Sequence, residues 1–286
     1  MHNILKKTGL WLMAIVSIHF LHSCTDDLKA KIPAYIEVDT IQLKITDPMQ
    51  GSARHKFKDV WLFVNDNLIG AYELPAKMPV LAEGNCKVVI VPGILLNGFA
   101  GLRGQYTPIK PYNQTLKLKP DSVIKITPEM SYDPAINFQL TENFEAGSKF
   151  IKTPSSSSDF LQLLGVSFEG ANCGYASLQG DELQFECESI QPFFLPNPTA
   201  KNIYLELHYK SNTKFNVAIK GAGSIPQVIG VQGINKSDVW NKIYVGLTPA
   251  VNSYSGGSNF RLMFNFQRDT SITKQELFLD NIKVLY

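Results

Sequence analysis

The stretch Ile203-Tyr204-Leu205-Glu206-Leu207-His208-Tyr209-Lys210 decides the fold, because apolar and polar side chains alternate along it. Successive side chains of a β-strand point to opposite faces of a sheet, so a period of two predicts a strand with one buried side and one solvated side. The stretch 260–267 repeats the pattern, with Phe at 260, 264 and 266. We therefore expect one-sided sheets, with Tyr204, Glu206 and His208 facing solvent.

The same alternation continues along most of the chain, in short segments that end at Pro, Gly, Asn or Asp. Residues 60–64 and 68–74 flank Asn65-Asp66-Asn67, which tolerate the left-handed backbone of a tight turn and so predict a hairpin. Between residues 34 and 45 the apolar residues change from even positions (36 and 38) to odd positions (41, 43 and 45), which is typical of a β-bulge. The stretch 128–134 holds two prolines and little periodicity. We place a domain boundary there and expect an all-β protein of two sandwiches, over residues 32–128 and 136–286.

The N-terminus has the features of a secretory signal. Lys6 and Lys7 precede an apolar run over residues 10–20, and Leu21-His22-Ser23-Cys24 follows. The run is too short for a transmembrane helix, which needs about 20 residues. The pattern resembles the lipobox of bacterial lipoproteins. This resemblance implies a signal peptide over residues 1–23, acylation (palmitate) at Cys24, an anchor linker over residues 24–31 and a place in the cell outer membrane.

Thr25, Asp26 and Asp27 follow the cysteine, and this acidic tract resembles the surface-export signal of lipoproteins from the Bacteroidota. It implies exposure on the cell surface, with a periplasm-facing anchor as the alternative. Removal of residues 1–23 takes away two lysines and no acid, and so leaves 25 basic against 25 acidic residues. A chain without basic excess is a poor nucleic-acid binder, so we expect none.

Three cysteines remain beyond Cys24. Cys173 and Cys187 flank a predicted hairpin and are candidates for a disulfide, which an oxidising compartment permits but does not require. Cys86 is far from both in sequence, and we expect it to be a buried apolar residue.

The second half is bracketed by Phe144-Glu145 at its start and Phe278-Leu279-Asp280-Asn281-Ile282 at its end. This bracket resembles that of the jelly-roll carbohydrate-binding, galactose-binding-like modules. The resemblance implies a jelly roll over residues 136–286 and a structural calcium ion held by Glu145 and Asp280, with Glu142 as a substitute for Glu145. By alternation, Asp280 shares a strand face with Phe278, Ile282 and Val284, which predicts a buried acid. The alternative role for Asp280 is to accept hydrogen bonds from backbone amides. Residues 59–74 resemble the immunoglobulin-like or PEGA-like domains beside lipoprotein anchors.

The sequence offers little for catalysis. Only His55 and His208 remain after the signal, and the nucleophile-elbow, phosphate-loop and dinucleotide patterns are missing from the sequence. Glycoside hydrolysis needs only two carboxyl groups, and Glu186 and Glu188 share one strand face. A solvated strand face explains these two acids equally well. We expect no enzyme, and keep a jelly-roll glycoside hydrolase or polysaccharide lyase as the third function.

Sugar binding needs exposed aromatic rings, and the candidate ligand-binding residues are Tyr254, Trp240 and Tyr204. Tyr254 lies in a predicted loop, and Tyr204 is on the polar face of its strand. Trp240 begins a predicted strand and is either a core residue or a platform on which a sugar ring stacks. We predict a non-catalytic, lipid-anchored surface protein that binds a glycan through its C-terminal jelly roll. The alternative is an envelope assembly subunit that binds another protein.

Overall fold

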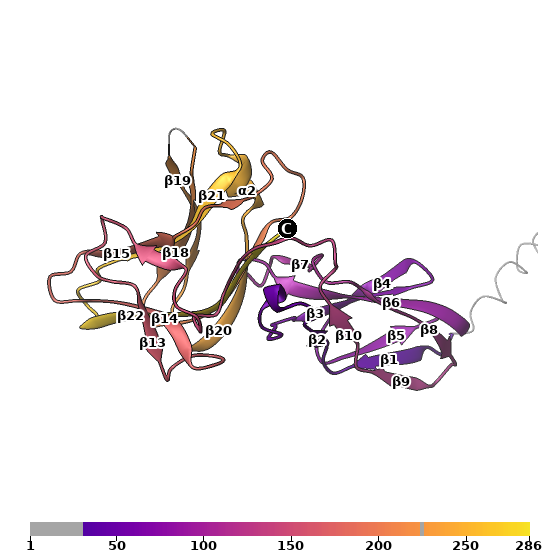
Figure 1. The fold of residues 1–286 in the computed structure, drawn as a ribbon. Helices are drawn as coiled ribbons and strands as arrows, with labels where there is room; N and C mark the ends of the chain where they lie inside the picture. The colour runs from indigo at the N-terminus through magenta and orange to yellow at the C-terminus, as the bar shows by residue number, and fades with distance from the viewer. Residues whose placement is uncertain (1–30, 224–225) are drawn as a thin grey trace, which may run out of the picture.

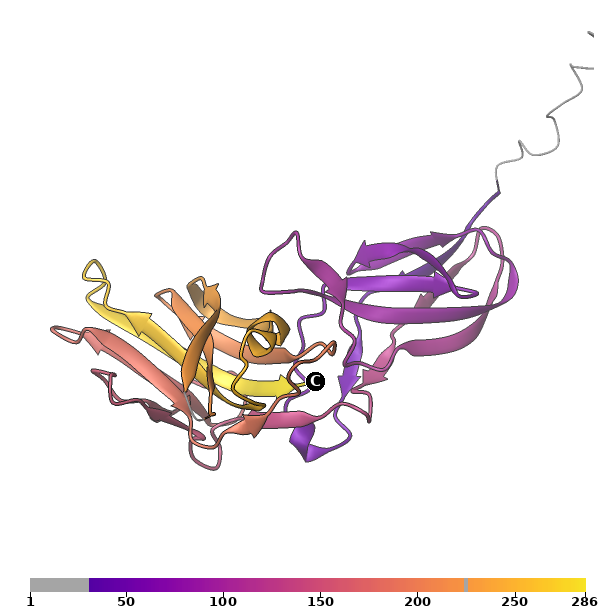
Figure 2. The same cartoon turned by 90° about the horizontal axis from the view of Figure 1, so that it is seen from above.

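The computed structural model describes residues 31–223 and 226–286, which form two β-domains side by side (Figure 1 and Figure 2). The predicted all-β fold class is confirmed. Within the described ranges, no helix has the length and apolarity needed to cross a bilayer. The predicted signal peptide, Cys24 and nearly all of the anchor linker lie outside the described residues.

The first domain packs one larger sheet against two small ones. The larger sheet has the order β4-β3-β6-β7, with β8 also paired to β6. In the small sheets, β1 lies between β5 and β9, and β2 pairs with β10. The strands are β1 (Ala34–Val38), β2 (Gln42–Lys44), β3 (Asp59–Val64), β4 (Asn67–Glu73), β5 (Ala76–Val80), β6 (Gly84–Leu95), β7 (Arg103–Gln105), β8 (Tyr112–Leu118), β9 (Val123–Ile126) and β10 (Glu129–Ser131).

Two details of the first domain test the local predictions. The β3–β4 hairpin is confirmed, and Asn65 and Asp66 adopt the positive φ angles (49° and 65°) that its turn requires. The bulge predicted between residues 34 and 45 is wrong, because the chain leaves one sheet after Val38 and enters another at Gln42. The phase change of the apolar residues therefore marks a switch between sheets.

The second domain is a jelly roll of two sheets. One sheet meets the first domain, and we call it the junction sheet; its strand order is β13-β14-β22-β17-β20, with β11 beside β22. We call the other the distal sheet; its strand order is β12-β15-β21-β18-β19, with β16 beside β21. The chain crosses repeatedly from one sheet to the other. The elements are β11 (Phe138–Glu142), β12 (Phe150–Lys152), β13 (Leu161–Leu164), β14 (Asn172–Gln179), β15 (Gln184–Ser189), β16 (Phe193–Phe194), β17 (Tyr204–Ser211), β18 (Phe215–Gly221), β19 (Gln227–Ile234), β20 (Ser237–Gly246), α2 (Thr248–Asn252), β21 (Asn259–Gln267) and β22 (Lys274–Leu285).

The apolar face of each predicted strand lies between the two sheets. Leu205 and Leu207 of β17 and Phe264 of β21 are fully buried there, as the alternation predicts. Burial of such a side chain stabilises the fold by roughly 1.5–3 kcal/mol. The core of the first domain is separate, but it includes Tyr204, Tyr244 and Leu285 from the junction sheet. The two domains thus share apolar packing, and the C-terminus ends at this junction (Figure 1).

Beside this apolar packing, the junction encloses a carboxylate. Glu206 of β17 is 1% exposed and accepts hydrogen bonds from Tyr106 (2.5 Å) and Tyr132 (2.7 Å) of the first domain. Lys242 of β20 pairs with its second oxygen at 2.5 Å. Burial alone would raise the pKa of Glu206, but the charges of Lys242 and Lys283 lower that pKa to about 2.

The prediction that Tyr204, Glu206 and His208 face solvent is wrong. They do share the outer face of the junction sheet, but all three are buried. The first domain covers Tyr204 and Glu206, and Phe168 stacks on His208 at 4.0 Å between ring centroids. A period of two identifies the two faces of a strand but not what covers the second face.

Candidate functional site

Beyond the junction, the outer face of the junction sheet carries a row of large side chains. Leu161 of β13 is opposite Tyr175 of β14, Tyr175 is opposite Phe278 of β22, and Phe278 is opposite Lys210 of β17. Trp240 of β20 continues the row at the edge of the sheet. Neighbouring strands are about 4.8 Å apart, so a row across five strands is roughly 20 Å long.

The aromatic rings of this row are in contact and only half-buried. Ring centroids are 5.0 Å apart for Tyr175 and Phe278, and 6.5 Å apart for Phe278 and Trp240. The ammonium group of Lys210 lies 5.6 Å from the Phe278 ring centroid. Phe168, 37% exposed, adds a ring 6.0 Å from Trp240. We call Tyr175, Phe278, Trp240 and Phe168 the aromatic face.

Two carboxylates hold the loop that carries Phe168. Asp280 accepts hydrogen bonds from the backbone N–H groups of Phe168 (2.9 Å) and Glu169 (3.0 Å). Glu145 accepts them from Ala171 (2.9 Å) and Asn172 (2.8 Å) at the other end of the loop. These bonds place Phe168 over the junction sheet.

The same bonds bear on the predicted calcium site at Glu145 and Asp280. The N–H donors occupy the carboxylate oxygens that a cation would need, and the substitute Glu142 accepts from the amides of Phe144 and Lys149. In the described part of the chain, no group of three acids, cysteines or histidines has metal-site geometry. The arrangement agrees with the alternative given for Asp280, that of an acceptor for backbone amides, and calcium binding at these acids is a matter for experiment.

One detail of β22 differs from the expected parity. Phe278 and Asp280 share the outer face, but Asn281 has a positive φ of 47°, and the pairing with β17 shifts there. Ile282 and Val284 therefore turn into the core. The expectation that Ile282 and Val284 share a face with Phe278 and Asp280 is therefore wrong.

Two of the three predicted sugar-binding residues are not exposed. Tyr254 is 3% exposed, packs against Phe260 at 5.4 Å and accepts a hydrogen bond from the amide of Gly223. A Cβ on Gly221 would lie 2.2 Å from the Tyr254 ring, so this glycine creates the slot that holds it. Tyr204 packs edge-on to Tyr106 at 5.0 Å in the junction. The predicted exposure of Tyr254 and Tyr204 is wrong, whereas half-buried Trp240 lies on the aromatic face.

The remaining cysteines are free and buried. Cys173 lies in the junction sheet and Cys187 in the distal sheet, so the disulfide considered between them does not form. Burial, followed by the charge of Asp280, raises the pKa of Cys173 to about 11. Cys86 is buried as predicted.

The carboxyl pair considered for hydrolysis is engaged in structural bonds. Glu186 accepts hydrogen bonds from the hydroxyls of Thr153 (2.7 Å) and Ser155 (3.0 Å). Glu188 pairs with Lys220 at 2.8 Å and lies 3.8 Å from Arg261. The two acids do share one face of β15, as predicted. That the protein is not an enzyme stays a prediction.

Sequence reasoning did not identify Tyr175, Phe278 and Phe168 as possible ligand contacts. Phe278 entered the sequence reasoning only as part of the closing motif 278–282. Its alignment with Tyr175 and Lys210 depends on the register between strands that are far apart in sequence. The available signal was an aromatic residue on the polar face of an alternating strand, as at Phe278 beside Glu276 and Asp280.

No family model and no curated protein matches this chain by sequence. Among solved structures, it resembles the CBM22-1 xylan-binding domain of Paenibacillus barcinonensis Xyn10C, at 13% identity and a TM-score of 0.38 over 53% of this chain and 96% of that one. It also resembles a family 11 carbohydrate-binding module of Clostridium thermocellum, solved with a mixed-linked tetrasaccharide, at 16% identity and a TM-score of 0.35 over 52% and 96%. An exo-β-agarase matches at 11% identity and a TM-score of 0.38 over 52% of this chain and 25% of the enzyme.

Proposed function

We propose that this protein is a non-catalytic, lipid-anchored surface protein that binds a glycan on the aromatic face of its C-terminal jelly roll. The observation that carries the proposal is the row of contacting, half-exposed rings formed by Tyr175, Phe278 and Trp240. Monomeric soluble proteins rarely leave such contiguous apolar surface uncovered without an interaction that uses it.

A pyranose ring has a side lined by C–H groups and a rim of hydroxyls. Burial of the C–H side on an aromatic ring removes apolar surface from water, and the negative ring face attracts the polarised hydrogens. The charged and amide groups around the row, among them Lys210 and Glu276, can exchange hydrogen bonds with the hydroxyls. The length of the row suits an extended oligosaccharide better than a single sugar.

The proposal is tested with the chain lacking residues 1–24, on a glycan array and then by calorimetry against the glycans that bind. Truncation of a central aromatic contact costs about 2 kcal/mol or more, which is roughly a 30-fold rise in Kd. We expect this loss for Trp240→Ala and for Phe278→Ala. The matched control is Phe194→Ala, which removes an exposed ring from the distal sheet.

Circular dichroism and thermal melting of each variant show that the fold is intact. Equal loss of affinity in the Phe194 control, or unchanged affinity in both aromatic-face variants, would refute the proposed site. Glycan turnover during these assays would refute the non-catalytic assignment, and Glu186→Gln would then show whether that carboxylate is required.

The proposed anchor is tested in cells. Acyl chains on Cys24 contribute about 0.8 kcal/mol for each buried methylene, and several chains make the attachment effectively permanent. We expect a Cys24→Ser variant to leave the membrane fraction, and protease added to intact cells to digest the natural protein. The first domain would then act as an immunoglobulin-like stalk below the jelly roll.

A second candidate is an assembly subunit that binds an envelope protein through the same face. The observation in its favour is Leu161 of β13, an aliphatic side chain that is 51% exposed and lies in the same row, opposite Tyr175. A silent glycan array, together with one envelope protein that co-purifies with the natural chain and is lost in Leu161→Asp, would favour this function.

A further inference from the structure

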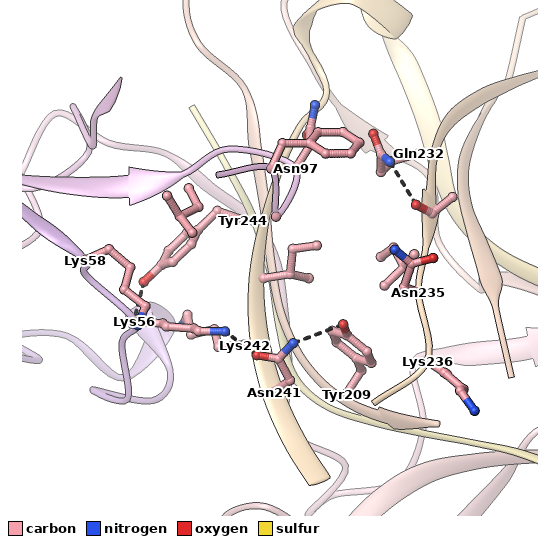
Figure 3. A pocket seen from close by; sticks show the side chains of 16 residues that line it. Lys56, Lys58, Asn97, Tyr209, Gln232, Asn235, Lys236, Asn241, Lys242 and Tyr244 are labelled. Carbon is pink, nitrogen blue, oxygen red and sulfur yellow. Dashed lines mark hydrogen bonds between the residues drawn. The ribbon is translucent and has the colours of Figure 1, made fainter. Parts of the chain in front are cut away.

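A cavity of about 490 Å³ lies where the first domain meets the open edge of the jelly roll (Figure 3). The first domain contributes Lys56, Lys58 and the loop that follows β6. The second domain contributes the end of β19, the turn after it, residues 241–244 of β20 and Tyr209 of β17. Figure 3 shows Lys56 and Lys58 on one side of the cavity and Asn235 and Lys236 across from them.

The charge of this cavity is of one sign. Its sixteen lining residues include four lysines and no Asp or Glu. Lys242 is neutralised by Glu206, and the ammonium group of Lys56 donates to the side-chain oxygen of Asn241. Among the described residues, neither Lys58 nor Lys236 has a carboxylate within 4.0 Å. Burial, and then the charge of Lys58, lowers the pKa of Lys56, as expected where ammonium groups are crowded.

The other lining groups suit a sugar. Phe99 lines the cavity with half of its surface exposed to solvent (50%), although it is a large apolar residue. Side-chain amides from both domains, among them Asn97, Gln232 and Asn235, also line it. An amide can donate to one hydroxyl and accept from another, while an aromatic ring takes the C–H side of a pyranose.

We infer that this cavity is a second saccharide site, which takes a sugar unit carrying a carboxylate or sulfate group. Lys58 and Lys236 supply the positive charge that no protein acid neutralises, Phe99 supplies the stacking surface and the amides bind hydroxyls. A volume of this size accommodates one or two sugar units, since small-ligand pockets usually measure roughly 300–1,000 Å³.

The inference does not depend on the aromatic face. Trp240 and Asn241 are adjacent in β20, but Trp240 points to the outer face of the junction sheet and Asn241 lines the cavity. None of the four residues of the aromatic face lines the cavity, so the two sites share no side chain. Each can therefore be removed without the other.

The test measures Kd by calorimetry for the chain lacking residues 1–24 with three probes: a tetragalacturonate, a chondroitin sulfate tetrasaccharide and neutral cellotetraose. We expect one of the two acidic probes to bind, and its Kd to rise at least tenfold in Lys58→Ala/Lys236→Ala and in Phe99→Ala. The charge-matched control is Lys117→Ala/Lys214→Ala, which removes two exposed lysines elsewhere and should change Kd less than threefold. Trp240→Ala should leave acidic-probe binding unchanged.

The two acidic probes separate a carboxylate ligand from a sulfate ligand. Failure of both acidic probes to bind would overturn the inference, as would equal losses in the cavity variant and the lysine control. Loss of acidic-probe binding in Trp240→Ala would assign that binding to the aromatic face, and would also overturn the inference of a second site. Loss of neutral-glycan binding in Trp240→Ala bears only on the proposed function.

Discussion

Substitution of Glu206 by Gln isolates the charge at the domain junction. The amide keeps the size of the side chain, so the packing around it is preserved, but Lys242 loses the carboxylate that it contacts at 2.5 Å. Both side chains are at most 5% exposed, so water cannot replace the lost charge. Removal of one partner from a buried ion pair costs about 3–5 kcal/mol. We expect the free energy of unfolding of Glu206→Gln to fall by this amount.

The assay is equilibrium unfolding in urea at pH 7, followed by far-UV circular dichroism and Tyr fluorescence. The control is Glu129→Gln, which breaks the exposed pair with Lys44 in the first domain and should cost less than about 1 kcal/mol. A separate early transition would show that the junction opens before either domain unfolds. A loss below about 1 kcal/mol in Glu206→Gln would refute the reasoning, because the pair would then be no more important than a surface pair.

Three further predictions follow from buried polar groups. Burial, and then the charge of Lys242, lowers the pKa of His208 to about 2, so the folded protein excludes a proton that the unfolded chain binds below pH 6.5. The natural protein should therefore lose stability relative to His208→Phe as the pH falls from 6.5, by at most about 1.4 kcal/mol per pH unit, measured by urea unfolding at several pH values. Asp280→Ala leaves the amides of Phe168 and Glu169 without their acceptor, so the free energy of unfolding should fall by about 1–3 kcal/mol. The loop should then be cleaved by protease within residues 165–170, whereas Glu276→Ala should not allow that cleavage. Because amide donors occupy Glu145 and Asp280, removal of divalent ions with EDTA should leave the Tm unchanged; a fall of several degrees that calcium restores would refute this.

The sequence predicted most of what depends on local alternation and turn chemistry. The β3–β4 hairpin, the apolar faces of β17 and β21 and the shared face of Glu186 and Glu188 are as expected. It failed where a second element covers a strand face. Glu206 and His208 are polar by pattern but buried, because a domain far away in sequence and a loop lie on them.

The candidate site was predicted only at Trp240, for two physical reasons. Tyr254 was predicted to be exposed because it lies in a loop, yet Gly221, Gly223 and Gly256 leave the slot that buries its ring. The aromatic face depends on register between strands of distant sequence position, and the cavity depends on how two domains dock. Neither property is encoded in the spacing of neighbouring residues.

The buried carboxylate at the junction and the basic cavity are linked through Lys242, which pairs with Glu206 and lines the cavity. Lys56 and Lys58 come from one domain and Lys236 and Lys242 from the other, so their mutual repulsion favours separation of the domains. Glu206 offsets part of this repulsion in the free protein. An acidic sugar in the cavity would offset more, because it would attract lysines of both domains at once. Since a ligand that binds only the docked arrangement stabilises it, acidic-sugar binding and domain docking are expected to strengthen each other by the same free energy.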